Sequence, residues 1–481
     1  EKTKKNIEDA IWYHGFRPRK DAIRLIVNPG DFLVRATDTG PTTDIVITAM
    51  DANRKTVNIT LRFDSGSSMW FIAQKSTLPA KFKFPTIVDL IDHYRVHAPS
   101  KHLKLSNVIT RPTWMIKHEH VVYEEKDKLG ADNFCSVYRG KLTTGQVVKD
   151  VAVKISLVAQ SAVDMESEEA KESRKAMQEA QIMSYYSHDN IIQFYGIACD
   201  HQPLLVVMEF CAGGDLLSHL LKHGKKTDEK EKMIYLYEAS RGMFYLHQKR
   251  CVHRDLAARN CLISNQEQIK IADFGESEAI DDEDRSGKNK NASNAQVPVR
   301  WMAPETLRKD APPKYSNASD IWTFGVMTYE VFSNGIKPWP EDPVKFVATQ
   351  IRKGNMPKLP AFQDSRTRES DVVRIRTMEP NKRPTMRQIA REFNTIIKDS
   401  TSSSGSTYGA NEMTINQIPG VTREEFFEHT NTSEFDDSYT TLDNDSFDKV
   451  EKSGDGGRPK HNRTKPSKSG PKRGSSLRES K

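Results

Sequence analysis

Residues 251–263 read CVHRDLAARNCLI, and the interpretation of the whole chain starts from this stretch. It carries a carboxylate, Asp255, and an amide, Asn260, between two apolar ends. A loop this short can bring a carboxylate oxygen and an amide oxygen within a few ångströms of each other. Downstream, the apolar run IKIADFG ends in Asp-Phe-Gly at residues 273–275, and upstream VAVK places Lys154 on a strand-like run. Each motif alone is common in unrelated proteins, but a chance occurrence of all three in this order and at these intervals is not expected.

The stretch resembles the catalytic loop of protein kinases, H-R-D-L-x-x-x-N, and the downstream run resembles their D-F-G motif. The resemblance implies that Asp255 orients the substrate hydroxyl and accepts its proton. It also implies that Asn260 and Asp273 hold Mg²⁺, or Mn²⁺ in its place, and that Lys154 grips the α- and β-phosphates of ATP. The implied activity is phosphoryl transfer from ATP.

The same resemblance implies a helix glutamate that holds Lys154. Glu179, in MQEAQIM, is the best match, and Glu172 is the alternative, because the charged insertion SAVDMESEEAKESRK lengthens the interval between lysine and helix. Glu305 of the APE motif is expected to form a structural pair with Arg383 of NKRP.

The residues after Asp255 bear on which hydroxyl is phosphorylated. Serine/threonine kinases usually place a lysine two residues after the catalytic aspartate, whereas this chain has Ala257 there and Arg259 four residues after. The run from Pro298 to Trp301, in VPVRWMAPE, would support a phenol ring that reaches further from its backbone. The pattern looks like that of a tyrosine kinase, with serine/threonine specificity as the alternative.

The glycine-rich loop that covers ATP in the family is degraded here. In KLGADNFCSVYRG, Gly130 is present, but Asp132 and Cys135 stand where the second and third glycines of G-x-G-x-x-G-x-V belong. A carboxylate about 5 Å from a phosphate charge costs at most on the order of 3 kcal/mol at an effective dielectric near 20, so we expect weakened ATP binding rather than an inactive enzyme. The expected nucleotide site comprises Leu129, Gly130, Ala131, Asp132, Asn133, Phe134, Cys135, Ser136, Val137, Lys154, Met208, Glu209 and Cys211.

A second resemblance covers the N-terminal region. WYHGFRPRKDAIRLI followed by GDFLVRATD resembles an SH2 domain, which binds phosphotyrosine. Arg35 ends an apolar run on a probable buried strand, and a buried guanidinium needs an anion. Family resemblance implies that Arg19 assists Arg35 in binding phosphotyrosine and that Thr37 stands at the position of the usual serine. The family's phosphotyrosine-contacting histidine, on a later strand, has no counterpart, because residues 57–60 read VNIT. The alternative for Arg35 is an internal salt bridge.

Composition narrows the class of protein. The 481 residues include 72 basic and 65 acidic ones, a balance that does not predict a nucleic-acid partner. No apolar run approaches the roughly 18 residues of a membrane span, so membrane contact is expected only through partners. The five cysteines are widely spaced and include no C-x-x-C pair, which argues against a disulfide framework or zinc site and favours a reducing, cytoplasmic location.

The expected fold class is α+β, with two folded domains and a tail. Residues 12–112 are expected to form the SH2 domain, a central antiparallel sheet flanked by two helices, and residues 113–122 a linker. Residues 123–398 are expected to form a bilobal kinase domain, with strands in its N-terminal lobe and helices in its C-terminal lobe. Residues 399–481 are expected to be a disordered tail, since they offer little apolar surface, and Tyr439 is a candidate phosphosite there.

An SH2 domain joined directly to a tyrosine kinase domain resembles the Fer/Fes branch of non-receptor tyrosine kinases. The resemblance implies protein tyrosine substrates, phosphotyrosine-containing partners and a role in intracellular signalling. The alternative is a pseudokinase adaptor that acts through its SH2 domain. Asp132 and the lack of a tyrosine in the segment after Asp-Phe-Gly favour the adaptor, whereas the intact residues Lys154, Glu179, Asp255, Asn260 and Asp273 favour the enzyme.

The family normally carries an activating tyrosine between Gly275 and Ala303, and this chain has none there. The segment begins instead with ESEAIDDEDRS. One hypothesis is that these carboxylates partly replace the phosphate by pairing with Arg254. The alternative is an acidic segment that is only solvated.

Overall fold

The computed structural model describes residues 6–38, 43–73, 82–131, 135–156, 168–279, 298–309, 311–360 and 378–402. Asp132, Asn133 and Phe134 of the degraded glycine loop lie outside these residues, as does Tyr439. Within the described part of the chain, no helix combines the length and the apolar character needed to cross a membrane.

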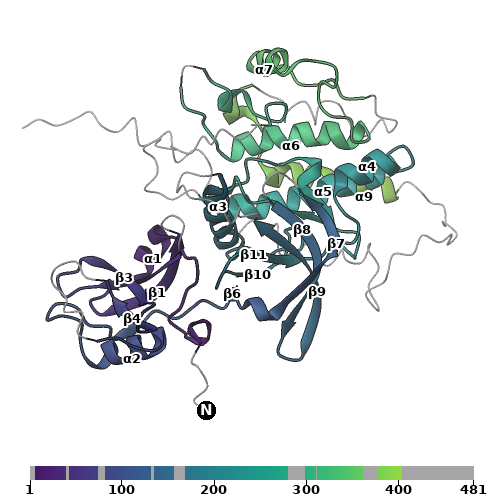
Figure 1. Ribbon diagram of the computed structural model, residues 1–481. Helices are drawn as coiled ribbons and strands as arrows, with labels where there is room; N and C mark the ends of the chain where they lie inside the picture. The colour runs from purple at the N-terminus through teal and green to yellow at the C-terminus, as the bar shows by residue number, and fades with distance from the viewer. Residues whose placement is uncertain are drawn as a thin grey trace, which may run out of the picture. The chain divides into compact units, whose positions relative to one another are not determined.

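The N-terminal domain is built on one five-stranded sheet with the order β4-β3-β2-β1-β5 (Figure 1). The neighbouring strands β1 to β4 pair antiparallel, and β5 pairs parallel with β1. Its elements are α1 (Arg19–Leu25), β1 (Asp31–Asp38), β2 (Thr43–Met50), β3 (Thr56–Asp64), β4 (Met69–Ile72), α2 (Ile87–Val96) and β5 (Asn107–Val108). The fold is therefore the expected one of a central sheet with two helices.

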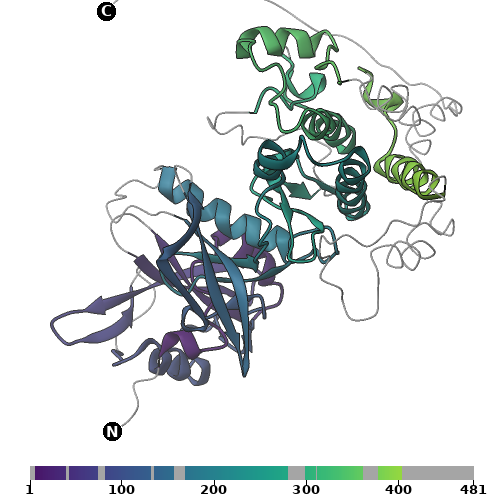
Figure 2. The same ribbon diagram turned by 90° about the vertical axis from the view of Figure 1, so that its right-hand side faces the viewer.

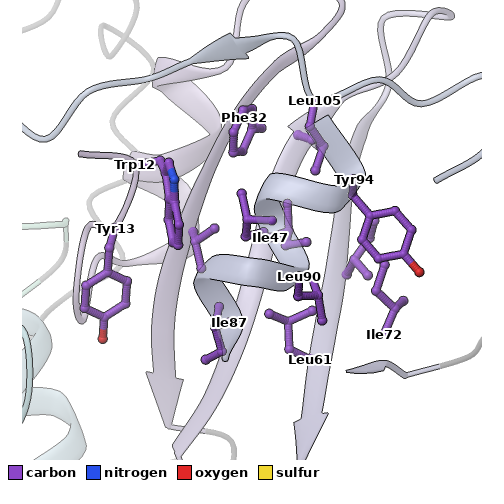
Figure 3. Close-up of a cluster of buried hydrophobic side chains, with 14 of the residues drawn as sticks. Trp12, Tyr13, Phe32, Ile47, Leu61, Ile72, Ile87, Leu90, Tyr94 and Leu105 are labelled. Atoms are coloured by element: carbon purple, nitrogen blue, oxygen red, sulfur yellow. The ribbon is translucent and has the colours of Figure 1, made fainter. Parts of the chain in front are cut away.

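The alternation along β1 separates the two faces of this sheet. Phe32 joins the main core under α2, where Ile87 and Leu90 of the helix face Ile47 of the sheet (Figure 3). Leu33 joins a smaller core with Ala22 and Ile26, in and just after α1. Because side chains alternate along a strand, Arg35 lies on the α1 face, the same face as Leu33.

The N-terminal lobe of the second domain is a six-stranded sheet with the order β6-β10-β11-β9-β8-β7 and helix α3 packed beside it (Figure 1). Its elements are β6 (Met115–Ile116), β7 (Val121–Ala131), β8 (Cys135–Thr144), β9 (Val147–Ser156), α3 (Glu168–Met183), β10 (Phe194–Ala198) and β11 (Leu205–Glu209). Strand β6 belongs to the segment expected as a linker, and it pairs parallel with β10. Arg111 fixes the start of that segment with an ion pair to the buried Asp200.

The C-terminal lobe is helical (Figure 2). Its main helices are α4 (Leu216–His223), α5 (Glu229–Gln248), α6 (Asn317–Phe332), α7 (Val344–Arg352) and α9 (Met386–Ser402). Asp228 caps α5, its Oδ1 accepting the backbone N–H of Glu231 at 2.7 Å, which satisfies a donor that the helix itself leaves unpaired. From Ser319 to Phe332, α6 is buried along its whole length, so this helix forms the centre of the lobe.

Two short sheets hold the catalytic-loop motif against the D-F-G motif. The loop leaves β12 (Cys251–Val252) and returns as β13 (Cys261–Ile263), which pairs with β14 (Ile269–Ile271). The D-F-G motif follows β14, and the chain then comes back as β15 (Glu278–Ala279) to pair with β12. The catalytic-loop motif therefore lies between β12 and β13, and the D-F-G motif lies between β14 and β15. The pairs β12–β15 and β13–β14 hold the two motifs together at both ends.

Candidate active site and phosphotyrosine pocket

Lys154 on β9 and Glu179 on α3 form the ion pair expected from the sequence. Lys154 Nζ lies 3.0 Å and 2.9 Å from the two carboxylate oxygens of Glu179, which is 4% exposed. Burial works to lower the pKa of Lys154, but the carboxylates of Glu179 and Asp273 outweigh it and raise the pKa above its ordinary value. Of the two candidates, Glu179 is therefore the partner of the lysine, and the lysine is charged.

Asp273 stands beside this pair, its Oδ1 lying 3.8 Å from Lys154 Nζ. Its φ of 63° is in the left-handed region, and the backbone N–H of Gly275 donates to its Oδ1 at 3.3 Å. Burial works to raise the pKa of Asp273, yet Lys154 and the Gly275 N–H bring it below the ordinary value. The side chain is therefore an anion, as a metal ligand must be.

Asp255 is held by the two polar residues that follow it in the loop. Asn260 Nδ2 donates to Asp255 Oδ2 at 2.8 Å and to its backbone carbonyl at 2.6 Å. Arg259 Nη2 donates to the other carboxylate oxygen at 2.5 Å. Burial raises the pKa of Asp255 and Arg259 opposes that rise, so the carboxylate is more basic than an ordinary aspartate.

Two buried carboxylates of α6 fix the backbone of the catalytic loop, and the sequence analysis missed both. Asp320 accepts the N–H groups of His253 and Arg254 at 2.8 Å and 3.0 Å. Glu330 accepts the N–H of Ala258 at 3.0 Å. A detectable signal existed: two acidic residues within the otherwise apolar run DIWTFGVMTYEVF require buried partners.

Arg259 also contacts the segment expected to support the substrate ring. Its guanidinium carbon lies 4.7 Å from the centre of the Trp301 ring, a cation–π distance. One side chain therefore links Asp255 to the Pro298–Trp301 run.

The described residues of the expected nucleotide site lie on four adjacent strands, β7, β8, β9 and β11, or just after β11. Gly130 on β7 pairs with Val137 on β8, which pairs in turn with Lys154 on β9. Leu129 is half exposed, whereas Ser136 is buried. The other expected residues fall at the start of β8 and at or just after the end of β11, namely Cys135, Met208, Glu209 and Cys211.

Glu305 and Arg383 form the structural ion pair that was expected from the sequence. The two guanidinium nitrogens donate to the two carboxylate oxygens at 2.7 Å and 2.9 Å, and both residues are buried. Such a bidentate pair supports the segment that carries Trp301 without taking part in the chemistry.

The N-terminal domain contains a second polar site, built around Arg35. This side chain is 4% exposed, with Nε donating to Thr48 Oγ1 at 3.1 Å and Nη2 lying 3.4 Å from Asn58 Oδ1. Burial, followed by the charge of Arg19, lowers the pKa of Arg35 to about 10. Among the described residues no carboxylate forms an ion pair with Arg35, so the alternative of an internal salt bridge finds no support there.

Asn58 on β3 also contacts Arg35, although the sequence analysis named no residue of this strand as a contact. It lies directly opposite Thr48 in the β2–β3 pairing, and the Thr48 hydroxyl donates to Asn58 Oδ1 at 2.9 Å. Together these side chains orient the Arg35 guanidinium. Arg19 begins α1 and Thr37 lies on β1, so both are on elements that border this site.

Comparison with known proteins agrees with this geometry. Residues 123–393 match the family model of protein tyrosine and serine/threonine kinases, and residues 12–94 match the SH2 domain model. The chain belongs to the Fer/Fps group of non-receptor tyrosine kinases. The match to Fer-related kinase 1 of Caenorhabditis elegans is 35% identical and covers 70% of this chain and 80% of that protein.

Two further relatives are longer than the region they share with this kinase. Tyrosine-protein kinase Fer of Homo sapiens is 32% identical over 82% of this chain, and the match spans 45% of its own length. The transforming protein Fps of avian sarcoma virus is 35% identical over 68% of this chain and 57% of its own length.

Kinases of this family use ATP and a divalent metal ion, and the residues present fit that requirement. Among the described residues no three His, Cys, Asp or Glu side chains gather into a metal site. The ligands on offer are the Asp273 carboxylate and the Asn260 amide oxygen, because the amide nitrogen is engaged by Asp255. So small a set suits Mg²⁺, which commonly takes one or two protein ligands and completes its shell with phosphate oxygens and water.

Proposed function

We propose that this kinase transfers the γ-phosphoryl group of ATP to tyrosine hydroxyls of proteins in a Mg²⁺-dependent reaction. The observation that carries the proposal is the joint placement of the Lys154–Glu179 ion pair, Asp273 and the Asp255–Asn260 pair. Phosphoryl transfer depends mainly on positioning and on charge stabilisation, and these residues supply both.

Each of these side chains has a separate task in the proposed reaction. Lys154, kept charged by Glu179, binds phosphate oxygens. Asp273 and Asn260 would hold the metal ion, which neutralises phosphate charge when bound. Asp255 orients the tyrosine hydroxyl and accepts its proton, a task helped by its raised pKa.

The preference for tyrosine is supported by Arg259. Its contact with Trp301 and its bond to Asp255 connect the platform for a phenol ring with the base that receives the phenol proton. The SH2 domain would bind phosphotyrosine through Arg35 and thereby recruit partners, in the cytoplasm or at membrane-associated complexes. Asp132 and the missing tyrosine between Gly275 and Ala303 are the sequence features that favour an adaptor without catalysis, and no contact among the described residues adds to them.

A transfer assay tests this function. The full chain is incubated with ATP, Mg²⁺ and a peptide that carries a single tyrosine, beside matched peptides with serine or threonine in its place. We expect phosphorylation of the tyrosine peptide alone, and a loss of about 10³-fold or more in kcat for Asp255→Asn with nucleotide binding retained. Equal rates for parent and variant would refute the assignment of Asp255.

A further inference from the structure

Arg254 presents an electrostatic problem next to the catalytic base. It immediately precedes Asp255, and its side chain is only 20% exposed. Its guanidinium carbon lies 4.6 Å from the centre of the Tyr315 ring, and its backbone N–H is held by Asp320. A largely buried guanidinium without an anion is strongly unfavourable, so the position of this loop depends on what neutralises Arg254.

In many kinases a phosphorylated residue of the segment after D-F-G supplies that anion, through a new pair between arginine and phosphate. This chain has no tyrosine between Gly275 and Ala303 that could serve. The structure contains a different anion, because a carboxylate oxygen of Glu278 forms an ion pair with Arg254 Nη2.

The backbone around Glu278 is fixed. Glu278 lies on β15, paired with Val252 of β12. The preceding residue, Ser277, is 3% exposed, donates its N–H to the carbonyl of Phe274 at 3.0 Å, and donates its hydroxyl to the carbonyl of His253 at 3.1 Å. The carboxylate is therefore presented to Arg254 by an ordered segment that is bonded to the catalytic loop itself.

We propose that Glu278 is a positioning residue that replaces the activating phosphate: its permanent charge neutralises Arg254 and holds Asp255 in place without phosphorylation of this segment. The inference rests on the proposed tyrosine kinase function and adds its mode of regulation. The Glu278–Arg254 ion pair is a pairing of the kind expected by the hypothesis on the acidic run, whose described members are Glu276, Ser277, Glu278 and Ala279; the replacement of the phosphate is the proposal. Of the two acids among them, Glu276 forms its ion pair with Lys175, at 2.8 Å, and acts on Arg254 only through its charge.

The first test uses the full chain stripped of phosphate by a phosphatase that acts on serine, threonine and tyrosine, with intact mass as the check. We expect the stripped protein to phosphorylate the tyrosine peptide at its full rate and without a lag. A stripped protein that is inactive and regains activity after autophosphorylation would overturn the inference while leaving the proposed function intact. Inactivity under both conditions would overturn both.

The second test separates positioning from folding. Glu278→Gln should lower kcat about 10- to 100-fold, the range of a lost charged hydrogen bond, with an unchanged KM for ATP; its melting temperature should fall, but the variant should remain fully folded at the assay temperature. Glu278→Asp should restore part of the rate. Glu341→Gln, which removes an exposed carboxylate of the same lobe, is the matched control and should match the parent.

A double variant completes the test. If Glu278 acts by neutralising Arg254, Glu278→Gln combined with Arg254→Gln should be no slower than Glu278→Gln alone, because no unpaired charge is left. The inference would be overturned if the loss of kcat in the double variant were the product of the losses in the two single variants. It would also be overturned if the Glu278→Gln variant were as active as the parent.

Discussion

At the residue scale, two influences act in opposite directions on the Asp255 carboxyl group. Burial raises its pKa and the positive charge of Arg259 lowers it, with the balance above the ordinary value. A base works only when deprotonated, so the rate should fall on the acid side at a pH higher than the ordinary aspartate pKa of about 4. We therefore expect the environment of this one carboxyl group to set the acid limit of activity.

Replacing Arg259 tests this balance. Arg259→Ala removes the charge that lowers the pKa of Asp255, so the acid limb of kcat/KM against pH should move to higher pH. Arg259→Lys keeps a positive charge, and its acid limb should stay closer to that of the parent. An alanine variant whose limb stays in place or moves to lower pH would show that another group governs the profile.

Site residues that belong to a contiguous sequence motif could be predicted, whereas residues that act through contacts with distant segments could not. Asp255, Asn260 and Asp273 belong to contiguous motifs, and the structure brings them together. Asn58 and Asp320 act through contacts with distant segments: the apolar run around Asp320 signals that this carboxylate is buried, but not which groups it binds. Asn58 acquires its place because β3 pairs with β2 in a register that sets it opposite Thr48.

At the element scale, some helices and strands can be read from local patterns. Residues 229–247 carry the mixed apolar and polar pattern of an amphipathic helix and form most of α5, and the β-branched run TDIVITAM at residues 43–50 is β2. The segment expected as a linker was the main surprise, because it adds β6 to a sheet edge. Its Trp-Met-Ile run is too short for any periodicity to predict a strand, and only the neighbouring β10 makes it one.

The β7–β8 hairpin carries a prediction of its own. Gly130 and Val137 frame the turn, and Asp132, outside the described residues, occupies the position of a phosphate-facing glycine in the family pattern. Asp132→Gly should lower the KM for ATP several-fold with little change in kcat, because it removes a charge repelled by phosphate. Asp132→Asn keeps the size and removes the charge, so it should give most of the same gain. An unchanged KM in both variants would mean that the carboxylate points away from the nucleotide.

At the scale of the whole molecule, the chain joins an SH2 domain, in which Arg35 is the proposed phosphotyrosine contact, to a kinase domain that is proposed to make phosphotyrosine. The two domains are linked by a short segment whose β6 strand is part of the kinase sheet, and the Tyr13 hydroxyl of the SH2 domain donates to the carbonyl of Asp200 at 2.9 Å. Under the proposed function, a substrate that already carries one phosphotyrosine would be held by the SH2 domain while the kinase domain acts on it. Holding two sites of one ligand raises the effective concentration of the second site.

This coupling predicts a preference for primed substrates. A peptide with one phosphotyrosine and a second, unmodified tyrosine at a suitable spacing should have a KM about 10-fold or more below that of the same peptide without the phosphate. Arg35→Ala should abolish the difference and leave the rate on the unphosphorylated peptide unchanged, since Arg35 lies in the SH2 domain and only binds. Arg62→Ala, which removes a more exposed arginine of the same sheet, is the control and should keep the preference. If Arg35→Ala retained the preference for the primed peptide, the kinase domain itself would have to recognise the phosphate, and the SH2 pocket would serve only to bind separate partners.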